Sequence, residues 1–183
     1  GFSNYGASIA AFHSPLIEWI ITFFMVLFGI NFALFYRAIT GDWRDALRSE
    51  ELHWYLGIYG TATIFSTMLL LPRYHGFWEA LRYGSFQVAS VMSTTGYATA
   101  DFNLWPVAVK MVLLLVMIVG GCAGSTAGGI KVVRTALLFK LGRREIRHTF
   151  QPRKVQVVRF EGKGVEEGML SQVAMFFCVY VLM

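Results

Sequence analysis

The chain has 183 residues, of which 56% are hydrophobic and 15% are charged, and its formal net charge is +5. Soluble domains contain about 45–50% apolar and about 25% charged residues. This composition therefore excludes an ordinary soluble protein and predicts an integral membrane protein. The two cysteines, Cys122 and Cys178, stand in separate apolar stretches. Their spacing supports neither a disulfide framework nor a zinc site.

Four apolar segments are expected to cross the membrane as helices, namely Leu16 to Tyr36, Trp54 to Leu71, Val107 to Phe139 and Gly168 to Met183. The last of them is shorter than the roughly 20 residues that a spanning helix needs. Since the chain also opens on Gly1 rather than on methionine, we expect a fragment of a longer protein. No secretory signal peptide is expected, because no basic segment precedes a cleavage site.

The connections between these segments differ in charge. Residues 140–167 hold eight Lys and Arg side chains, whereas 37–53 hold three, 72–106 hold two and 1–15 hold none. The positive-inside rule places 140–167 and 37–53 in the cytoplasm and 72–106 outside. We interpret the basic connection as a topogenic segment, with anionic lipid or a cytoplasmic partner as the alternative contact. Nucleic-acid binding is not expected in a loop between two spans.

The outer connection contains a helix-like stretch, FWEALRYGSFQVASVM, from Phe77 to Met92. A helix of its 16 residues would rise only about 24 Å. That length is too short to cross a bilayer core of about 30 Å and return to the same side. We therefore predict a re-entrant half-helix, which requires surrounding protein or a water-filled cavity.

The segment Val107 to Phe139 is too long instead, since a straight helix of this length would reach about 50 Å. We predict a break in the stretch GGCAGSTAGGIKVVR, because glycine permits non-helical backbone and hydroxyl groups can satisfy freed backbone groups. The residues of this break are Gly120, Gly121, Gly124, Ser125, Thr126, Gly128 and Gly129. The alternative is a straight helix in which glycines four residues apart form a small-residue packing face.

The half-helix is followed directly by STTGYATADF, Ser93 to Phe102. A dehydrated alkali cation needs a ring of oxygens, and backbone carbonyls supply them without a titrating charge. We predict that Thr94, Thr95 and Gly96 present such carbonyls. Gly96 is expected to allow a conformation in which a side chain would clash, and Tyr97 to wedge the loop against neighbouring helices. An ordinary extracellular turn is the alternative for this short motif taken alone.

The same pattern occurs at the start of the chain, where Gly1-Phe2-Ser3-Asn4 matches Gly96-Tyr97-Ala98-Thr99 as glycine, aromatic, small and polar. A proline opens the following apolar helix in both places. This repetition predicts units of span, pore helix, filter and span. The expected parts are 1–40, the end of one repeat; 41–53, a cytoplasmic loop; 54–139, a complete repeat; 140–167, the basic loop; and 168–183, the first helix of the next repeat.

On these motifs the chain resembles the Trk/Ktr/HKT superfamily of potassium transporters, and within it the bacterial TrkH-type subunit. STTGYAT is similar to that family's third filter and GFSN to the end of its second. GGCAGSTAGGIKVVR is similar to the glycine-rich break in the inner helix of its third repeat. The resemblance implies an all-α polytopic membrane protein in which four repeats surround one pseudo-fourfold pore.

The resemblance also implies a site and partners. The implied filter residues are Thr94, Thr95, Gly96 and Tyr97 in one quarter, with K⁺ held at the first three, and Gly1 and Phe2 in another. The segment Gly120 to Gly129 would be an intramembrane gating loop beneath the filter. A homodimer in the bacterial inner membrane and a cytoplasmic nucleotide-binding regulatory subunit are implied. No bound cofactor is implied besides K⁺ as the transported ion.

The sequence supports separate expectations for four residues outside these motifs or beside them. Ala98 stands where tetrameric potassium channels of the TVGYG type have a second glycine, which implies looser coordination near the outer site. Glu18 is expected at the outer membrane interface, and Asn31 in an interhelical hydrogen bond. Asp101 is either a cation-attracting carboxylate at the outer mouth or a solvated turn residue. Val follows Lys131 where a phosphate-binding loop needs Ser or Thr, and no enzymatic activity is predicted.

Two functions fit these residues. In the first, the chain is the pore-forming part of a cation translocator that is gated by the glycine-rich loop. In the second, it is a non-conducting membrane assembly subunit whose glycines only pack helices. We favour the first, because the doublets Gly120-Gly121 and Gly128-Gly129 lie off a single helix face.

Overall fold

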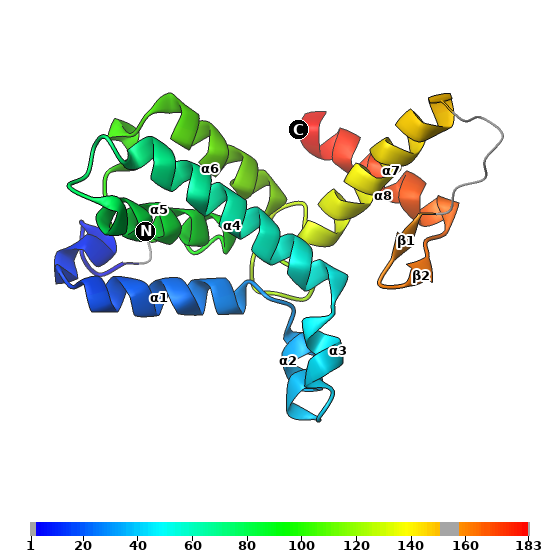
Figure 1. Ribbon diagram of the computed structural model, residues 1–183, viewed down its shortest axis with the longest axis horizontal. Coiled ribbons are helices and arrows are strands. Elements are labelled where there is room, and N and C mark those ends of the chain that lie inside the picture. Colours follow the sequence, from blue (N-terminus) through cyan, green and yellow to red (C-terminus); the bar gives the residue numbers. More distant parts are fainter. Residues whose placement is uncertain (1–2, 151–157, 183) are drawn as a thin grey trace.

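The computed structural model of the chain describes residues 3–150 and 158–182, and these residues are mostly helical (Figure 1). The elements in chain order are η1 (Ser8–Phe12), α1 (Pro15–Phe28), α2 (Phe32–Ile39), α3 (Trp43–Leu47), α4 (Glu50–Leu70), α5 (Phe77–Met92), η2 (Phe102–Leu104), α6 (Val107–Val119), α7 (Val132–Phe150), β1 (Arg159–Phe160), β2 (Lys163–Gly164) and α8 (Glu167–Leu182). Figure 1 shows α1, α4, α5 and α6 gathered in one bundle. The α2 and α3 helices form a separate hairpin below this bundle.

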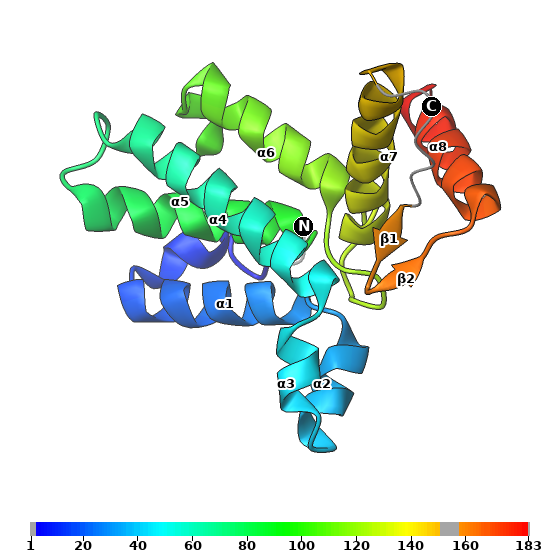
Figure 2. The same cartoon turned by 45° about the vertical axis from the view of Figure 1, so that its right-hand side comes forward.

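The main core lies between α4, α5 and α6. Its buried members include Tyr55 and Leu70 of α4, Val88 and Met92 of α5, and Val109 of α6. Full burial of one such side chain stabilises a fold by about 1.5–3 kcal/mol. A second cluster joins α1 to the opposite side of α5, so that α5 lies between α1 and α6 (Figure 2). The predicted helix Phe77 to Met92 is confirmed with the same bounds, and its neighbours hold it on both sides.

The first apolar segment is broken, contrary to the prediction of one helix over Leu16 to Tyr36. The α1 and α2 helices meet at 91°. Asn31 is the N-cap of α2, and its side-chain oxygen accepts a hydrogen bond from the Ala33 amide at 2.9 Å. Gly29, two residues before this cap, is the C-cap of α1. The prediction was wrong because an Asn cap shortly after a glycine starts a new helix more readily than it continues an old one.

Over residues 3–150 and 158–182, no single helix is both long enough and apolar enough to cross a membrane. The bent pair of α1 and α2 reaches that length and composition together, whereas α6 and α8 are apolar but shorter.

The segment Val107 to Phe139 is broken, as predicted. The α6 helix ends at Val119 and α7 begins at Val132. Residues 120–131 between them are not helical. The alternative of a straight helix with a glycine packing face is therefore wrong for this segment, because a face of that kind exists only where the backbone is helical.

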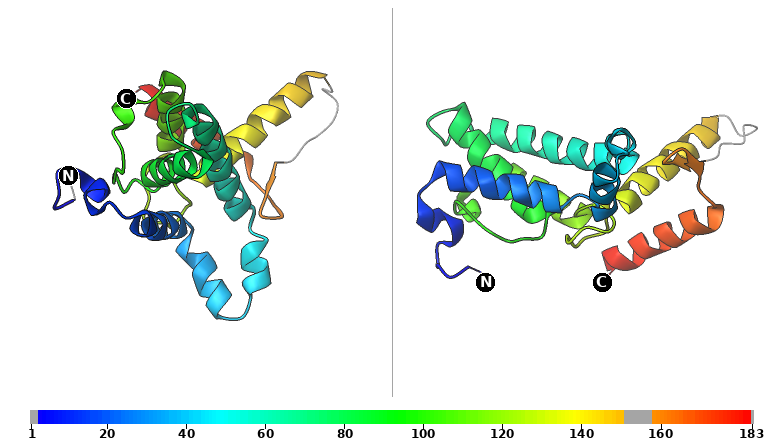
Figure 3. Two further views of the ribbon diagram at one scale, coloured as in Figure 1. Left: turned by 60° about the vertical axis from the view of Figure 1, so that its left-hand side comes forward. Right: turned by 90° about the horizontal axis from the view of Figure 1, so that it is seen from below.

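The basic segment 140–167 is not a loop throughout. The α7 helix continues to Phe150, and the strands β1 and β2 then pair as a short antiparallel hairpin. This hairpin leads into α8, which packs against α7 (Figure 3). The charged residues after Phe139 extend the amphipathic α7 beyond the apolar run. The assignment of 140–167 as a cytoplasmic connection between two spans stays a prediction.

Two further expectations concern side chains in α1 and α2. Glu18 is 5% exposed, and the Nε atom of Arg82 in α5 lies 3.3 Å from its carboxylate. The α5 helix therefore covers Glu18, and its position at the outer membrane interface stays a prediction. The expected interhelical hydrogen bond of Asn31 is confirmed, because its Nδ2 atom donates to Glu51 of α4 at 3.1 Å.

Candidate functional site

The predicted filter segment is fastened to the C-terminal end of α5. The amides of Thr95 and Gly96 both donate to the Ser90 carbonyl, at 2.9 and 3.4 Å. The Ser90 hydroxyl donates to the Tyr97 carbonyl at 2.6 Å. The Ser93 and Thr95 hydroxyls lie 2.7 Å apart. The last turn of α5 therefore fixes the path of the segment that follows it.

Three consecutive carbonyl groups of this segment receive no hydrogen bond from the residues that the structure describes. Among the residues that the structure describes, no hydrogen bond ends on the backbone oxygens of Thr94, Thr95 or Gly96. The next carbonyls are occupied, since Tyr97 accepts from Ser90 and the Ala98 oxygen accepts from two amides of η1. Unpaired carbonyls at such a place are available to a cation or to water.

The backbone of the segment alternates between ordinary and left-handed conformations. Thr94 has φ +56° and Gly96 has φ +78°. A Cβ atom placed on Gly96 would meet nothing within 4 Å. Glycine is favoured here by its conformation, as predicted, because left-handed backbone costs other residues about 1–2 kcal/mol.

Tyr97 packs against the cluster of α1 and α5 that contains Met25 and Phe86, which confirms the predicted wedge. The residues that follow the first, repeated motif lie beside this one. The Ser8 hydroxyl accepts a hydrogen bond from the Ala98 amide at 3.2 Å. Gly1 and Phe2, the predicted part of another filter, lie outside the described residues.

The glycine-rich loop, residues 120–131, closes on itself at its base. The Ile130 amide donates to the Ile118 carbonyl and the Val132 amide to the Gly121 carbonyl, each at 2.9 Å. The two sides approach so closely that a Cβ atom on Gly120 would lie 2.0 Å from the Gly128 oxygen. Within the loop, the Ser125 hydroxyl donates to the Cys122 carbonyl at 2.7 Å, as predicted for a freed backbone group.

The tip of the loop reaches the break between α1 and α2. The Cys122 amide donates to the Gly29 carbonyl at 3.0 Å. The Gly124 carbonyl accepts from the Phe32 amide at 3.3 Å. Thr126 also reaches α1, and its hydroxyl donates to the Phe28 carbonyl at 3.4 Å. Two interrupted helices thus satisfy each other's freed backbone groups.

The loop also contacts the filter segment directly. The Gly128 amide donates to the Thr94 hydroxyl at 3.0 Å. A hollow of about 480 Å³ adjoins this contact and is bounded on its apolar side by α1. Its polar lining includes Ser93, Thr95 and Thr126. The structure therefore brings the predicted filter and the predicted gating loop to one place.

Sequence reasoning missed one residue of this arrangement, Glu51 of α4. Its carboxylate accepts from the Ala123 amide of the loop at 2.5 Å and from Asn31 at 3.1 Å. Glu51 is 5% exposed. The sequence alone indicated no role for Glu51. A signal that could have found it is the pair of helix breaks, both of which need hydrogen-bond partners.

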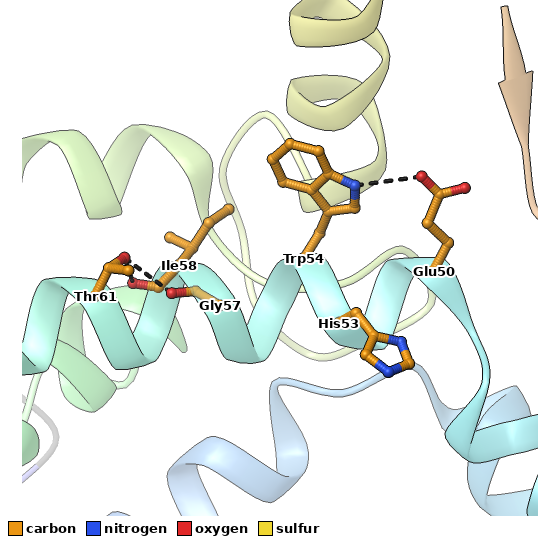
Figure 4. Close-up of a pocket in the computed structure, with 6 residues that line it drawn as sticks. All are labelled: Glu50, His53, Trp54, Gly57, Ile58 and Thr61. Carbon is orange, nitrogen blue, oxygen red and sulfur yellow. Dashed lines mark hydrogen bonds between the residues drawn. The ribbon is translucent and has the colours of Figure 1, made fainter.

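A second hollow, of about 390 Å³, lies along α4 and is separate from the filter (Figure 4). Its lining residues are Glu50, His53, Trp54, Gly57, Ile58 and Thr61. Glu50 forms an ion pair with Lys140 of α7. Burial raises the pKa of Glu50, but hydrogen bonds from Lys140 and the Glu161 amide outweigh it and hold that pKa below its usual value. None of the predicted site residues lines this hollow.

The sequence was compared with protein families. A family model described as "TrkH: Cation transport protein" matches residues 1–73 and 77–183. The chain therefore belongs to the TrkH family of cation transport proteins, and the predicted resemblance is confirmed. This family is one of transporters, so the prediction that the chain is not an enzyme is also confirmed.

The chain is similar to individual members over its whole length. It is 34% identical over 191 residues to the Trk system potassium uptake protein TrkH of Escherichia coli strain K12, and covers 38% of it. It is 33% identical over 184 residues to TrkG of the same organism, again covering 38%. The crystal structure of the potassium transporter TrkH from Vibrio parahaemolyticus matches with a TM-score of 0.93 and 32% identity, and the match covers 100% of this chain and 40% of that one. The chain thus spans about two fifths of the length of these relatives.

Proposed function

We propose that this chain is part of the pore-forming subunit of a potassium uptake system. Thr94, Thr95 and Gly96 supply backbone oxygens that replace the water around K⁺, and Tyr97 holds the segment in place. The observation that carries this proposal is the row of three carbonyls that accept from none of the described residues, at the end of a helix that its neighbours cover on both sides. Carbonyl oxygens coordinate a dehydrated cation without adding a charge that titrates.

The Ala98 carbonyl is not part of this row. Its oxygen accepts from the amides of Ile9 and Ala10 in η1, and those bonds compete with an ion. The row of carbonyls that can coordinate K⁺ therefore ends near Tyr97. This agrees with the looser coordination at the outer site that Ala98 implies. We infer that the selectivity for K⁺ over Na⁺ depends on fewer carbonyl rings than in channels with the TVGYG motif.

The glycine-rich loop is the proposed gate. It lies against the filter through the bond from Gly128 to Thr94 and against the first helix pair through Cys122 and Gly124. A loop held by single hydrogen bonds, each worth about 0.5–1.5 kcal/mol, can leave its place at a modest cost. Such a loop suits a barrier that opens and closes, whereas a continuous helix does not.

The number of repeats, the oligomeric state and the partners are proposed for the full-length protein. The relatives are named as Trk system potassium uptake proteins, and on that likeness we propose four repeats around one pore, of which residues 54–139 are one complete repeat. A homodimer in the bacterial inner membrane and control by a cytoplasmic nucleotide-binding subunit are part of the same proposal. The basic segment 140–167 then faces the cytoplasm.

The second candidate, a non-conducting assembly subunit, relied on glycines that pack straight helices. Residues 120–131 are not helical, and their glycines allow close approaches within the loop and to Asn31 and Thr94. That candidate therefore loses the feature on which it depended.

The proposal is tested with the full-length protein in bacterial cells that lack their own potassium uptake systems. Growth at low K⁺ and uptake of ⁸⁶Rb⁺ are the measurements, with empty vector as the control. We expect the full-length protein to restore both. Normal membrane levels of the protein without any ⁸⁶Rb⁺ uptake would count against a pore and in favour of an assembly role.

A further inference from the structure

Glu51 is a buried carboxylate at the point where four segments of the chain meet. Its side chain belongs to the first turn of α4, and its two oxygens accept from two other segments. One oxygen accepts from the Ala123 amide at 2.5 Å, and the other from the Asn31 side chain at 3.1 Å. The exposed fraction of Glu51 is only 5%.

Both hydrogen-bond partners of the Glu51 side chain lie where a helix is interrupted. Ala123 lies in the glycine-rich loop, and Asn31 caps the new helix after the break between α1 and α2. Among the residues that the structure describes, no ion pair involves Glu51. The cost of burying this carboxylate is therefore offset by hydrogen bonds from these two partners, and bonds to a charged acceptor are about twice as strong as neutral ones.

We propose that Glu51 is the positioning residue that holds the gating loop beneath the filter. This inference rests on the proposed function for its meaning in transport, although the position of the loop can be measured without transport. The Asn31 side chain donates to one carboxylate oxygen while its own oxygen accepts from Ala33. Glu51 thereby connects the loop to the capped N-terminus of α2. This connection holds the loop in one position.

A second contact connects Glu51 to the cytoplasmic hairpin. The Glu161 carboxylate, at the turn between β1 and β2, accepts from the Ser49 hydroxyl at 2.8 Å and from the Glu51 amide at 3.2 Å. The backbone of Glu51 thus contacts the hairpin while its side chain contacts the loop. A displacement of the hairpin acts on the residue that positions the gate, and Glu161 is the contact through which it does so.

The loop provides its own reporter for this proposal. Cys122 stands next to Ala123 and is fully buried, whereas Cys178 in α8 is exposed. In the full-length protein carrying Cys122 as its single cysteine, the rate of labelling by a maleimide in nanodiscs reports how often the loop leaves its place. With Glu51 present, we expect the loop to stay in place and the maleimide to label Cys122 slowly.

The informative variants are Glu51→Gln and Glu50→Gln. The glutamine at 51 keeps the shape and one acceptor but presents a donor to Asn31, so we expect Cys122 to react at least tenfold faster. Glu50→Gln is the matched control, because Glu50 contacts Lys140 and the Glu161 amide rather than the loop. Its glutamine still offers an oxygen to that amide, so the rate should stay within twofold of the parent. Glu51→Asp, which keeps the charge, should give an intermediate rate.

Labelling of the Glu51→Gln variant at the parent rate would overturn the proposal, as would equal acceleration in Glu50→Gln. The uptake of ⁸⁶Rb⁺ is measured on the same proteins as a separate readout. Fast labelling of the Glu51→Gln variant together with no uptake by the parent would leave Glu51 as the loop's positioning residue and refute the pore instead. The two proposals therefore fail in different ways.

Discussion

The backbone amide of Gly128 donates a hydrogen bond to the hydroxyl of Thr94 at 3.0 Å, and this bond joins the glycine-rich loop to the filter segment. It is the shared contact of two motifs that lie far apart in the sequence. The carbonyl of Thr94 remains available to a cation, because the bond uses only its side chain. In the proposed function, this one residue serves the filter through its backbone and the gate through its hydroxyl.

Thr94→Val removes this bond while it keeps the β-branched shape and the carbonyl. We expect the closed gate to lose about 0.5–1.5 kcal/mol, which raises the resting ⁸⁶Rb⁺ flux about two- to twelvefold. The preference for Rb⁺ over Na⁺ should be unchanged. Thr94→Ser keeps the hydroxyl and is the matched control in a proteoliposome flux assay. An equal rise in flux for both variants would show that the hydroxyl does not hold the gate.

Gly120→Ala tests whether the loop needs its close approach. A Cβ atom at this position would lie 2.0 Å from the Gly128 oxygen, and Gly120 has φ +71°. We expect the variant to lose about 3 kcal/mol of stability through overpacking and backbone strain, with a lower Tm in detergent. Gly57→Ala in α4, where a Cβ meets nothing within 4 Å, should keep or slightly raise Tm. An unchanged Tm for Gly120→Ala would contradict the loop geometry.

The buried pair of Glu18 and Arg82 fixes α1 against α5. Arg82→Met leaves the carboxylate of Glu18 buried without its partner, and we expect a loss of about 3 kcal/mol. The measurement is the Tm of the full-length protein in detergent. The double variant with Glu18→Gln should recover most of this loss, because no uncompensated charge remains. Failure of the double variant to recover would show that Arg82 stabilises the fold through its stem rather than through the ion pair.

Glu161→Ala tests the contact between the hairpin and α4. The Glu161 carboxylate accepts from the Ser49 hydroxyl and the Glu51 amide. Their loss should cost about 1 kcal/mol and speed tryptic cleavage at Arg159 or Lys163 about fivefold. Glu166→Ala, an exposed carboxylate in the same segment, should leave the rate unchanged. Cleavage that is equally fast in both variants would mean that the hairpin is not docked through Glu161.

The features predicted correctly are those that local sequence determines. The bounds of α5 followed from one apolar stretch between Gly76 and Ser93, and the break after α6 followed from the excess length of its segment and its glycines. The wedge of Tyr97 followed from its place beside the half-helix.

The features that were missed depend on contacts across the chain. No role was predicted for Glu51, because its partners, Asn31 and Ala123, belong to other segments of the chain. The ion pair of Glu18 was not predicted either, because its position near a helix start gives no sign of Arg82 in α5. The first helix break could have been read from Gly29 and Asn31, but the hydropathy of the flanking residues hid it.

The most direct test of the account is the cation selectivity of Gly96→Ser in the full-length protein. Uptake of ⁸⁶Rb⁺ and ²²Na⁺ is compared with the parent and with Gly41→Ser, a control that also has positive φ and open space around it but lies between α2 and α3. The account predicts that Gly96→Ser abolishes ⁸⁶Rb⁺ uptake or admits Na⁺, since strain of about 1–2 kcal/mol displaces the carbonyls of the filter. Gly41→Ser should behave as the parent. Parent-like ⁸⁶Rb⁺ uptake and Na⁺ exclusion in Gly96→Ser would contradict the assignment of Thr94, Thr95 and Gly96 as the filter.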